Sequence, residues 1–430
     1  MKKLLFILLL TIPFFSIGQG WEKIYGGTSD EWGFSIQQTN DGGYVITGSK
    51  SFLKVSLIKT DNNGDSLWNK NFDGDVGYSV QQTNDGGYII TGLKSIFDST
   101  FNLEGNVFLI KTDENGDSLW TKTFGGTENE LGRSIQQTND GGYIITGYTN
   151  SFGNGTEDLY LIKTDNNGDS LWTKTFGDTN GEEGYSVQQT NDGGYIITGV
   201  KSFFSNGLTL DIYLIKTDEN GDSLWTKTFG GTSNETGSSV QQTNDGGYII
   251  TGSTWSFGNG VTDVYLIKTD ENGDSLWTKT YGGTGRETGS SIQQTNDGGY
   301  IITGSTQSFG NGGYDVWLIK TDGNGDSLWT KTYGGIDDDH GSSVQQTNDG
   351  GYIITGYTSS FGNGDIDIYI IKTDGNGNVT STFNIPNPPT NRKLEKVVDI
   401  LGRETKPPKN TPFIEIYDDG SIEKKLIIDK

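Results

Sequence analysis

Short apolar runs separated by turn residues fill most of the chain. The segment Gly237–Gly283 shows the pattern once: the runs GSSVQQT, YIITGST, VYLIKTD and DSLWTKTYGG are separated by NDGG, WSFGNGVTD and ENG. Each run is short, rich in β-branched and aromatic residues, and bounded by turn residues, which is typical of β-strands. Asn-Gly supplies the positive φ that a hairpin turn requires. The pattern predicts four antiparallel strands and no helix.

The same twelve residues mark seven copies of this unit. QQTNDGGYVITG begins at Gln37, and QQTNDGGYIITG begins at Gln81, Gln136, Gln188, Gln241, Gln293 and Gln345. Successive copies start 44, 55, 52, 53, 52 and 52 residues apart, a period typical of propellers and solenoids. Four-stranded sheets stacked radially bury both faces and leave only short edges. We predict an all-β fold, a seven-bladed β-propeller of four-stranded antiparallel blades, over residues 19–383. A β-solenoid is the alternative, although its coils are usually shorter.

The two ends of the repeat array predict ring closure. A fourth-strand sequence, WEKIYGG, begins at Trp21, before the first full copy. The matching strand after the seventh copy decays to NVTSTFN, from Asn378. We expect Trp21–Tyr25 to complete the last blade. The sequence leaves open whether Val379–Phe383 also pairs.

Composition and charge limit the kinds of site and partner that the chain can have. The chain has 66 Gly, 7 Pro and no Ala, the best helix former, which supports the all-β prediction. The absence of Cys excludes disulfides, zinc–thiolate sites and cysteine nucleophiles, and His340 is the only histidine. The net charge of -24 argues against a nucleic-acid or anionic-membrane partner. It allows a cationic partner, divalent metal included.

Both termini differ from the repeat. Lys2 and Lys3, the apolar run Leu4–Ile17 and the small residues before Gln19 predict a signal peptide over residues 1–18. An uncleaved membrane anchor is the alternative for this segment. No other segment of the sequence is expected to span a bilayer. Residues 384–391, NIPNPPTN, predict a Pro/Asn linker, and residues 392–430 predict a small C-terminal β module.

Two resemblances follow from these motifs. The repeated DGGYIITG, YLIK and NGDSLWTKTFGG segments resemble the bacterial β-propeller repeat family and, more distantly, NHL-type propellers, a fold that hosts many unrelated functions. In the tail, DILGRE at Asp399–Glu404, the segment Phe413–Gly420 and KKLII at Lys424–Ile428 resemble the type A sorting domain of cargo of the type IX secretion system of Bacteroidetes. This resemblance implies recognition by that secretion machinery and a secreted or outer-membrane cell-surface location, reached through the periplasm. A structural β-cap is the alternative.

Comparison of the seven copies separates two faces of the predicted propeller. The TNDGG and D-x-N-G turns, on one face, are identical in all copies and indicate structural turns. The D-x-N-G-D stretch superficially matches a calcium loop, but its spacing favours a hairpin. The loops on the opposite face vary, and varied loops on a rigid scaffold are where function is usually built. Drift after duplication is the alternative.

One carboxylate recurs on the variable face, two residues before the Gly of each inner strand. The seven residues are Glu31, Asp75, Glu130, Glu182, Glu235, Glu287 and Asp339. A ring of carboxylates at one mouth of the channel could bind calcium, the one cofactor that the sequence suggests. The alternative, which we favour, is that each carboxylate caps backbone N–H groups of its own loop.

Residues that break the repeat are the candidates for a single site. Asp337, Asp338 and His340 could supply an acid/base pair or metal ligands, or could be merely solvated. Trp32, Trp255 and Tyr314 could stack on sugar rings or anchor a protein partner, or could pack under their loops. Arg133 and Arg286 are further candidates for binding on this face.

These observations favour an exported binding or adhesion module for a glycan or a protein. One alternative is a propeller enzyme, a lyase or hydrolase, that acts on extracellular polysaccharide with the Asp337–His340 loop at its site. The other alternative is a purely structural surface protein. The sequence favours the binding module over the enzyme, because nothing in it matches the site motifs of quinone dehydrogenases or sialidases.

Overall fold

The computed structural model describes residues 20–97, 103–204, 208–379, 394–399, 403–406, 413–417 and 422–425. The chain divides into two compact units, Met1–Thr380 and Ser381–Lys430. The predicted signal peptide and the Pro/Asn linker lie outside the described residues, as do residues 380–383 of the segment whose pairing the sequence leaves open.

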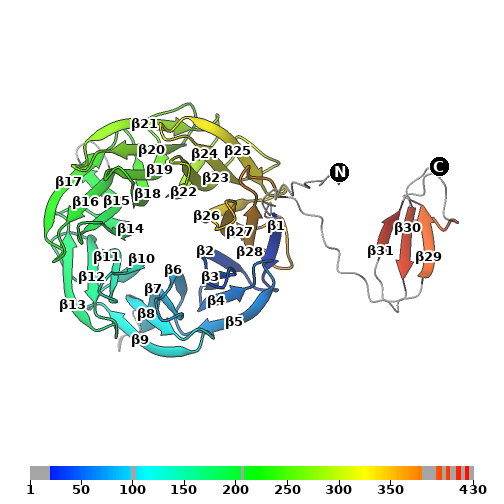
Figure 1. The fold of residues 1–430 in the computed structure, drawn as a ribbon, viewed down its shortest axis with the longest axis horizontal. Helices are drawn as coiled ribbons and strands as arrows, with labels where there is room; N and C mark the ends of the chain where they lie inside the picture. The colour runs from blue at the N-terminus through cyan, green and yellow to red at the C-terminus, as the bar shows by residue number, and fades with distance from the viewer. Residues whose placement is uncertain are drawn as a thin grey trace, which may run out of the picture. The chain divides into compact units, whose positions relative to one another are not determined.

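The first unit is a closed ring of seven antiparallel four-stranded sheets around a central channel (Figure 1), which confirms the predicted seven-bladed propeller. Six blades are each built from four consecutive strands. Blades 1 to 3 comprise β2 (Glu31–Gln38), β3 (Tyr44–Lys50), β4 (Lys54–Thr60), β5 (Ser66–Phe72); β6 (Val76–Gln82), β7 (Tyr88–Phe97), β8 (Leu103–Thr112), β9 (Ser118–Phe124); and β10 (Glu130–Gln137), β11 (Tyr143–Thr149), β12 (Asp158–Thr164), β13 (Ser170–Phe176). Blades 4 to 6 comprise β14 (Glu182–Gln189), β15 (Tyr195–Phe204), β16 (Leu208–Thr217), β17 (Ser223–Phe229); β18 (Glu235–Gln242), β19 (Tyr248–Thr254), β20 (Asp263–Thr269), β21 (Ser275–Tyr281); and β22 (Glu287–Gln294), β23 (Tyr300–Thr306), β24 (Asp315–Thr321), β25 (Ser327–Tyr333).

The seventh blade joins the two ends of the array. It contains β26 (Asp339–Gln346), β27 (Tyr352–Thr358) and β28 (Asp367–Thr373), and its outer strand is β1 (Trp21–Tyr25). β1 pairs antiparallel with β28, with Trp21 opposite Lys372 and Tyr25 opposite Ile368. The prediction that Trp21–Tyr25 completes the last blade is therefore confirmed. Because every other blade is continuous in sequence, this one strand pairing closes the ring.

The hydrophobic core lies between neighbouring blades rather than inside any one of them. Between blades 1 and 2, for example, Val55 and Leu57 of β4 pack with Tyr88 and Phe108 of the next blade, all almost fully buried. The middle strands β3 and β4 are buried on both faces, whereas the outer strand β5 is exposed along one face. This explains why the middle strands are continuously apolar and the outer ones alternate.

A β-bulge interrupts the inner strand of each blade at the same place. In blade 1 it falls between Gly33 and Ser35, and all seven inner pairs share it. Next to the bulge, the backbones of the first two strands approach closely, because a Cβ added at Gly48 would lie 1.8 Å from the carbonyl oxygen of Trp32. Only glycine fits at this position of the twelve-residue motif, and the bulge aims its extra side chain independently of the strand alternation.

The second unit contains one three-stranded antiparallel sheet in the order β29 (Leu394–Asp399), β30 (Phe413–Tyr417) and β31 (Ile422–Lys425). Val397 and Val398 of β29 are buried. This sheet confirms a small β module at the C-terminus. In the described part of the chain, no helix is long and apolar enough to cross a bilayer.

Candidate functional site

The two ends of the central channel differ in chemistry, because each inner strand runs from one end to the other. We call the end formed by the start of the inner strands, such as Glu31–Phe34 in blade 1, the variable mouth. We call the other end, formed by Gln37 and its six equivalents together with the TNDGG turns, the glutamine mouth. The loops of the two mouths are joined through the same rigid sheets.

At the glutamine mouth, each TNDGG turn is held by a buried lysine. In blade 1, Asp41 accepts hydrogen bonds from the Thr39 hydroxyl at 2.5 Å and from the Gly43 N–H at 3.0 Å. The same carboxylate lies 2.9 Å from Nζ of Lys59, which is 4% exposed. These partners hold the pKa of Asp41 below its usual value, although partial burial opposes them. All seven blades repeat this ion pair, so the identical residues serve a structural role.

The two glutamines of each motif connect neighbouring blades in opposite directions. The side-chain oxygen of Gln37 accepts a hydrogen bond from the backbone N–H of Gln82 in the next blade, at 2.6 Å. The side-chain oxygen of Gln82 in turn accepts one from the N–H of Asn40 in the preceding blade, at 2.9 Å. Sequence analysis showed that these residues are uniform but missed this role, because a single copy does not reveal its partner in the next one.

The seven recurrent carboxylates at the variable mouth are local caps. Six of them are buried, and each of these six accepts a hydrogen bond from the backbone N–H four residues earlier; Gly126 N donates to Glu130, for example, at 2.8 Å. The seventh, Asp75, is half-buried and accepts from Ser95 N at 2.7 Å. Within the described residues, no group of three or more acidic or histidine side chains is placed to hold a metal ion. Calcium binding stays a prediction.

A second buried carboxylate lies beside most of these caps. A Cβ added at Gly177 would lie 2.1 Å from Asp158 Oδ1 and 2.6 Å from Glu182 Oε2, so the two carboxylates of neighbouring blades flank this glycine. Asp315 and Asp339 flank Gly334 in the same way. Burial, followed by the charge of Asp339, raises the pKa of Asp315 above its usual value. The sequence did not suggest these pairs, since their members come from different repeats.

The loop with the only histidine is packed rather than solvated. His340 lies between the rings of Tyr314 and Tyr357, with centroid distances of 4.8 and 4.7 Å, and its Nδ1 is 2.7 Å from the Ser305 hydroxyl. Burial lowers the pKa of His340, which therefore stays neutral at pH 7. Asp338 is exposed and accepts a hydrogen bond from Tyr314 N, at 2.9 Å.

Asp337, next to it, is exposed too, and its backbone N–H donates to the Ser360 hydroxyl at 3.1 Å. No hydrogen bond or ion pair within the described residues joins either aspartate to the histidine ring. The structure thus does not assemble Asp337, Asp338 and His340 into one acid/base constellation.

Arg133 is the centre of a cluster at the variable mouth. It occupies the bulge position of β10, and its guanidinium carbon lies 5.1 Å from the ring centroids of both Tyr78 and Tyr185, which occupy the bulge positions of the neighbouring blades. Glu183 Oε2 lies 3.5 Å from Arg133 Nη2, and the Phe34 ring lies 5.2 Å from Tyr78. The bulge positions of the other three blades are Ser238, Ser290 and Ser342.

Arg133 was a candidate from the sequence, but its aromatic neighbours were not. The signal was present: the residue after the inner-strand Gly reads Phe, Tyr, Arg, Tyr, Ser, Ser and Ser along the blades. Glu157, in the adjoining loop, has a raised pKa because of burial and then the charge of Glu183. The variable mouth thus carries aromatic, cationic and acidic groups on one half of its rim and small hydroxyl groups on the other.

The other candidates on this face lie in the outer loops. Trp32 packs on Phe52 with a centroid distance of 4.0 Å, and Tyr314 packs on His340. Trp255 and Arg286 are exposed. Further exposed apolar side chains lie in loops of the same face, among them Ile336 at 80% and Leu53 at 72% exposure. This face therefore offers several separate apolar contacts besides the Arg133 cluster.

Comparison with known proteins supports the fold alone. No family model matches the chain. The regulatory protein FlaEY of Caulobacter vibrioides is 26% identical over 159 residues, which amount to 31% of this chain and 17% of that protein, so the chain spans less than a fifth of its length.

Among solved structures, the WD40 β-propeller domain of Doa1 is similar with a TM-score of 0.52 and 14% identity, over 83% of this chain and 96% of that one. YCF48 from Cyanidioschyzon merolae has a TM-score of 0.47 and 10% identity, over 82% and 98%. The strand order and the likeness to the Doa1 domain establish that residues 21–373 form a seven-bladed β-propeller.

Proposed function

We propose that this protein is an exported binding module whose variable mouth recognises a glycan or protein outside the cell. The supporting observation is the Arg133 cluster, where the residues that break sevenfold symmetry gather on neighbouring blades. A symmetric ring offers the same group seven times, whereas a specific ligand needs one arrangement of unlike groups. Aromatic rings beside an arginine are the residues most enriched at binding hot spots.

The ligand of such a cluster must offer both an apolar face and an acceptor. The rings of Tyr78 and Tyr185 flank the guanidinium, so the edge of Arg133 is left for a carboxylate or carbonyl oxygen. Its Nε atom is buried and has no hydrogen-bond partner among the described residues. Acidic sugars and acidic peptide segments meet both requirements.

A glycan and peptide array with the mature protein tests this proposal. We expect Arg133→Ala to weaken binding of the recognised ligand by about tenfold or more, the loss typical of a hot-spot residue. Arg286→Ala removes the same charge from an exposed loop of the same face and serves as the matched control. Equal binding by both variants, or equal loss in both, would place the site elsewhere.

We further propose that the C-terminal unit is the address for export across the outer membrane. This rests on the resemblance of residues 392–430 to type IX sorting domains, together with the predicted signal peptide. A chain truncated after Phe383 should remain in the periplasm of its native host with the melting temperature of its propeller unchanged. Arrival of the truncated chain at the cell surface would reject the address, and unfolding would identify the tail as a structural cap.

A further inference from the structure

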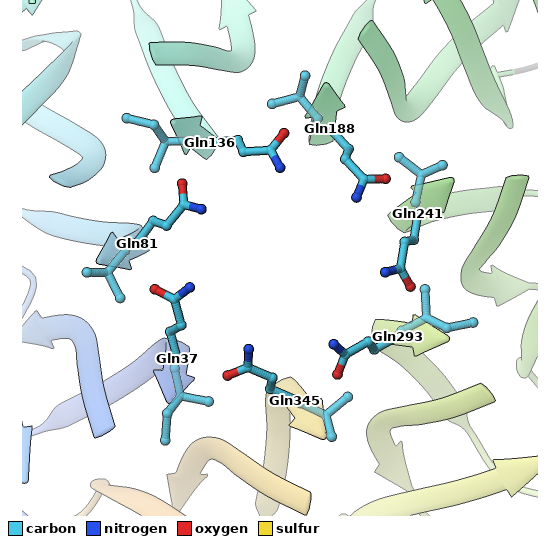
Figure 2. Close-up of a pocket in the computed structure, with 14 residues that line it drawn as sticks. Gln37, Gln81, Gln136, Gln188, Gln241, Gln293 and Gln345 are labelled. Carbon is cyan, nitrogen blue, oxygen red and sulfur yellow. The ribbon is translucent and has the colours of Figure 1, made fainter. Parts of the chain in front are cut away.

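The glutamine mouth contains a closed ring of seven identical amides. Figure 2 shows the side chains of Gln37, Gln81, Gln136, Gln188, Gln241, Gln293 and Gln345 arranged around the channel, with their nitrogen atoms nearer its centre than their oxygen atoms. These residues, together with the Ile or Val before each, line a cavity of about 260 Å³. Gln136 lies three residues after Arg133 on β10, about 10 Å along the strand, and none of the residues of the Arg133 cluster lines the cavity, so the inference does not depend on the function proposed above.

Hydrogen bonds between blades fix the orientation of each amide. Every one of the seven side-chain oxygens accepts a hydrogen bond from the backbone N–H of the next blade, at 2.5 or 2.6 Å. An NH2 group cannot accept a hydrogen bond, so reversing an amide would place two donors against each other. The oxygens are therefore held against the wall, and the nitrogens must face the channel.

The channel-facing N–H groups donate to no acceptor among the described residues. These seven nitrogens are also not among the buried polar atoms that lack a partner, so they are open to the channel. The ring thus presents seven NH2 groups to the channel, while each side-chain oxygen is directed to the wall and already accepts one hydrogen bond. A ligand that only accepts hydrogen bonds therefore matches the ring better than one that must donate them, such as a lysine.

The charged groups around this mouth do not oppose an anion as strongly as the net charge suggests. Each aspartate of the TNDGG turns is paired with a buried lysine of its own blade, such as Lys163 with Asp140 at 2.9 Å. The residues beside the amides carry no charge; Ile135 and Val187, for example, are apolar and almost fully buried. Amide dipoles whose positive ends converge on one space attract an anion.

We propose that the glutamine ring binds a small oxyanion on the channel axis: a free inorganic oxyanion or a carboxylate group. Such a group accepts hydrogen bonds without having to donate any, which is what the ring offers. Each N–H bond to a charged acceptor is stronger than a neutral one. Because the seven amides are equivalent, a ligand can engage those on any side of the ring.

Calorimetric titration of the mature full chain tests the proposal, with sodium sulfate, phosphate and acetate as probes at constant ionic strength. The decisive variant is Gln188→Glu, because the carboxylate still accepts the hydrogen bond from Gln242 N but replaces a donor by a negative charge. The matched control is Gln189→Glu. Its side-chain oxygen accepts from Asn139 N, and the residue does not line the cavity.

We expect saturable binding of at least one of these anions, about tenfold or more weaker in Gln188→Glu and nearly unchanged in Gln189→Glu. Gln293→Glu, two blades further round the ring, should behave like Gln188→Glu and guards against a local folding defect. A comparison of the affinities for glucuronic acid and acetate shows whether the ring prefers a carboxylate attached to a sugar or a small free carboxylate. No saturable binding of any probe, or equal weakening in Gln188→Glu and Gln189→Glu, would overturn the proposal.

Discussion

The two mouths of the channel are built from the same seven inner strands, yet one is uniform and the other varies. On the side of the glutamine mouth, several repeated residues contact a neighbouring blade: the paired glutamines by hydrogen bonds, and Trp68 of the outer strand by an edge-on contact with Tyr88, with the ring centroids 5.8 Å apart. At the variable mouth, the recurrent carboxylates accept hydrogen bonds from backbone N–H groups of nearby loops. Side chains that contact the next copy must match it, whereas these caps leave the side chains beside them free to change.

This difference explains why the residues that are identical in all copies and the candidate binding residues lie on different sides of the propeller. A residue such as Gln82 contacts the preceding blade twice, because its N–H donates to the Gln37 side chain and its side-chain oxygen accepts from the Asn40 N–H in the turn of that blade. A change in one copy therefore disturbs the fit of its neighbours. The bulge position of Arg133 carries no such requirement, since serine occupies it in three blades.

The largest expected effect comes from opening the ring, on which both mouths depend. A chain that begins at Gly26 lacks β1, so β28 becomes an unpaired edge and the contact of Trp21 with Tyr44 is lost. We expect the melting temperature to fall by about 10 °C or more, measured by circular dichroism. A chain that begins at Gly20 is the control and should melt like the mature protein. Equal melting of both chains would mean that closure adds nothing to stability.

Two glycines, one on each side of the propeller, allow a direct comparison of how tightly the two sides are packed. A Cβ added at Gly43, in the TNDGG turn, would lie 2.1 Å from the backbone oxygen of Thr60, whereas one added at Gly27, on the variable side, would meet nothing within 4 Å. We expect Gly43→Ala to lower the free energy of unfolding by about 3 kcal/mol and Gly27→Ala to change it by less than about 0.5 kcal/mol, measured by urea denaturation. Similar losses in both variants would contradict the contrast.

The carboxylates of the two sides should respond to pH with opposite sign. Hydrogen bonds from Thr295 and Lys320 outweigh partial burial and lower the pKa of Asp297 to about 2, whereas burial and then Asp339 raise that of Asp315. Asp297 therefore adds stability that is present above the unfolded-state pKa of about 3.8 and is lost as pH falls towards 2. Asp315 adds stability below the unfolded-state pKa, which is lost as pH rises through its folded-state pKa.

Accordingly, Asp297→Asn should lower the free energy of unfolding at pH 7 by about 1 kcal/mol, a modest loss because the Asp297 side chain is 60% exposed. Asp315→Asn should raise the free energy of unfolding slightly at pH 7. Urea denaturation between pH 2 and 7 measures both effects, and each should shrink as the pH approaches 2. Changes of the same sign at pH 7 would show that the two sides are not electrostatically distinct.

Arg133→Ala should have only a small effect on stability. Its contacts are two cation–π interactions and a long ion pair of 3.5 Å, so we expect the free energy of unfolding to fall by about 1 kcal/mol or less. Ser290→Ala, at the equivalent position of blade 6, is the reference for a bulge residue without these contacts. A loss as large as that of Gly43→Ala would give Arg133 a structural role instead of one in binding.

The repeat pattern was enough to predict the fold, and the stray fourth-strand sequence at Trp21 was enough to predict closure. Turn chemistry identified the TNDGG segments as structural. The sequence could not show which copy each glutamine contacts, or that Asp158 and Glu182 meet across Gly177, because such neighbours are set by the radial packing. It also named Arg133 without Tyr78 and Tyr185, since strand alternation does not anticipate where a bulge directs its side chain.

The pairing of β1 with β28 determines when the ring can close in a newly synthesised chain. β1 is synthesised first, but its partner β28 is complete only when Thr373 has left the ribosome. During that time β1 can contact blade 1, through Trp21 and Tyr44 for example, but it has no strand to pair with. The ring can be completed only when β1 meets β28, so the time to a protease-resistant ring depends on the meeting of two segments that are far apart in the chain.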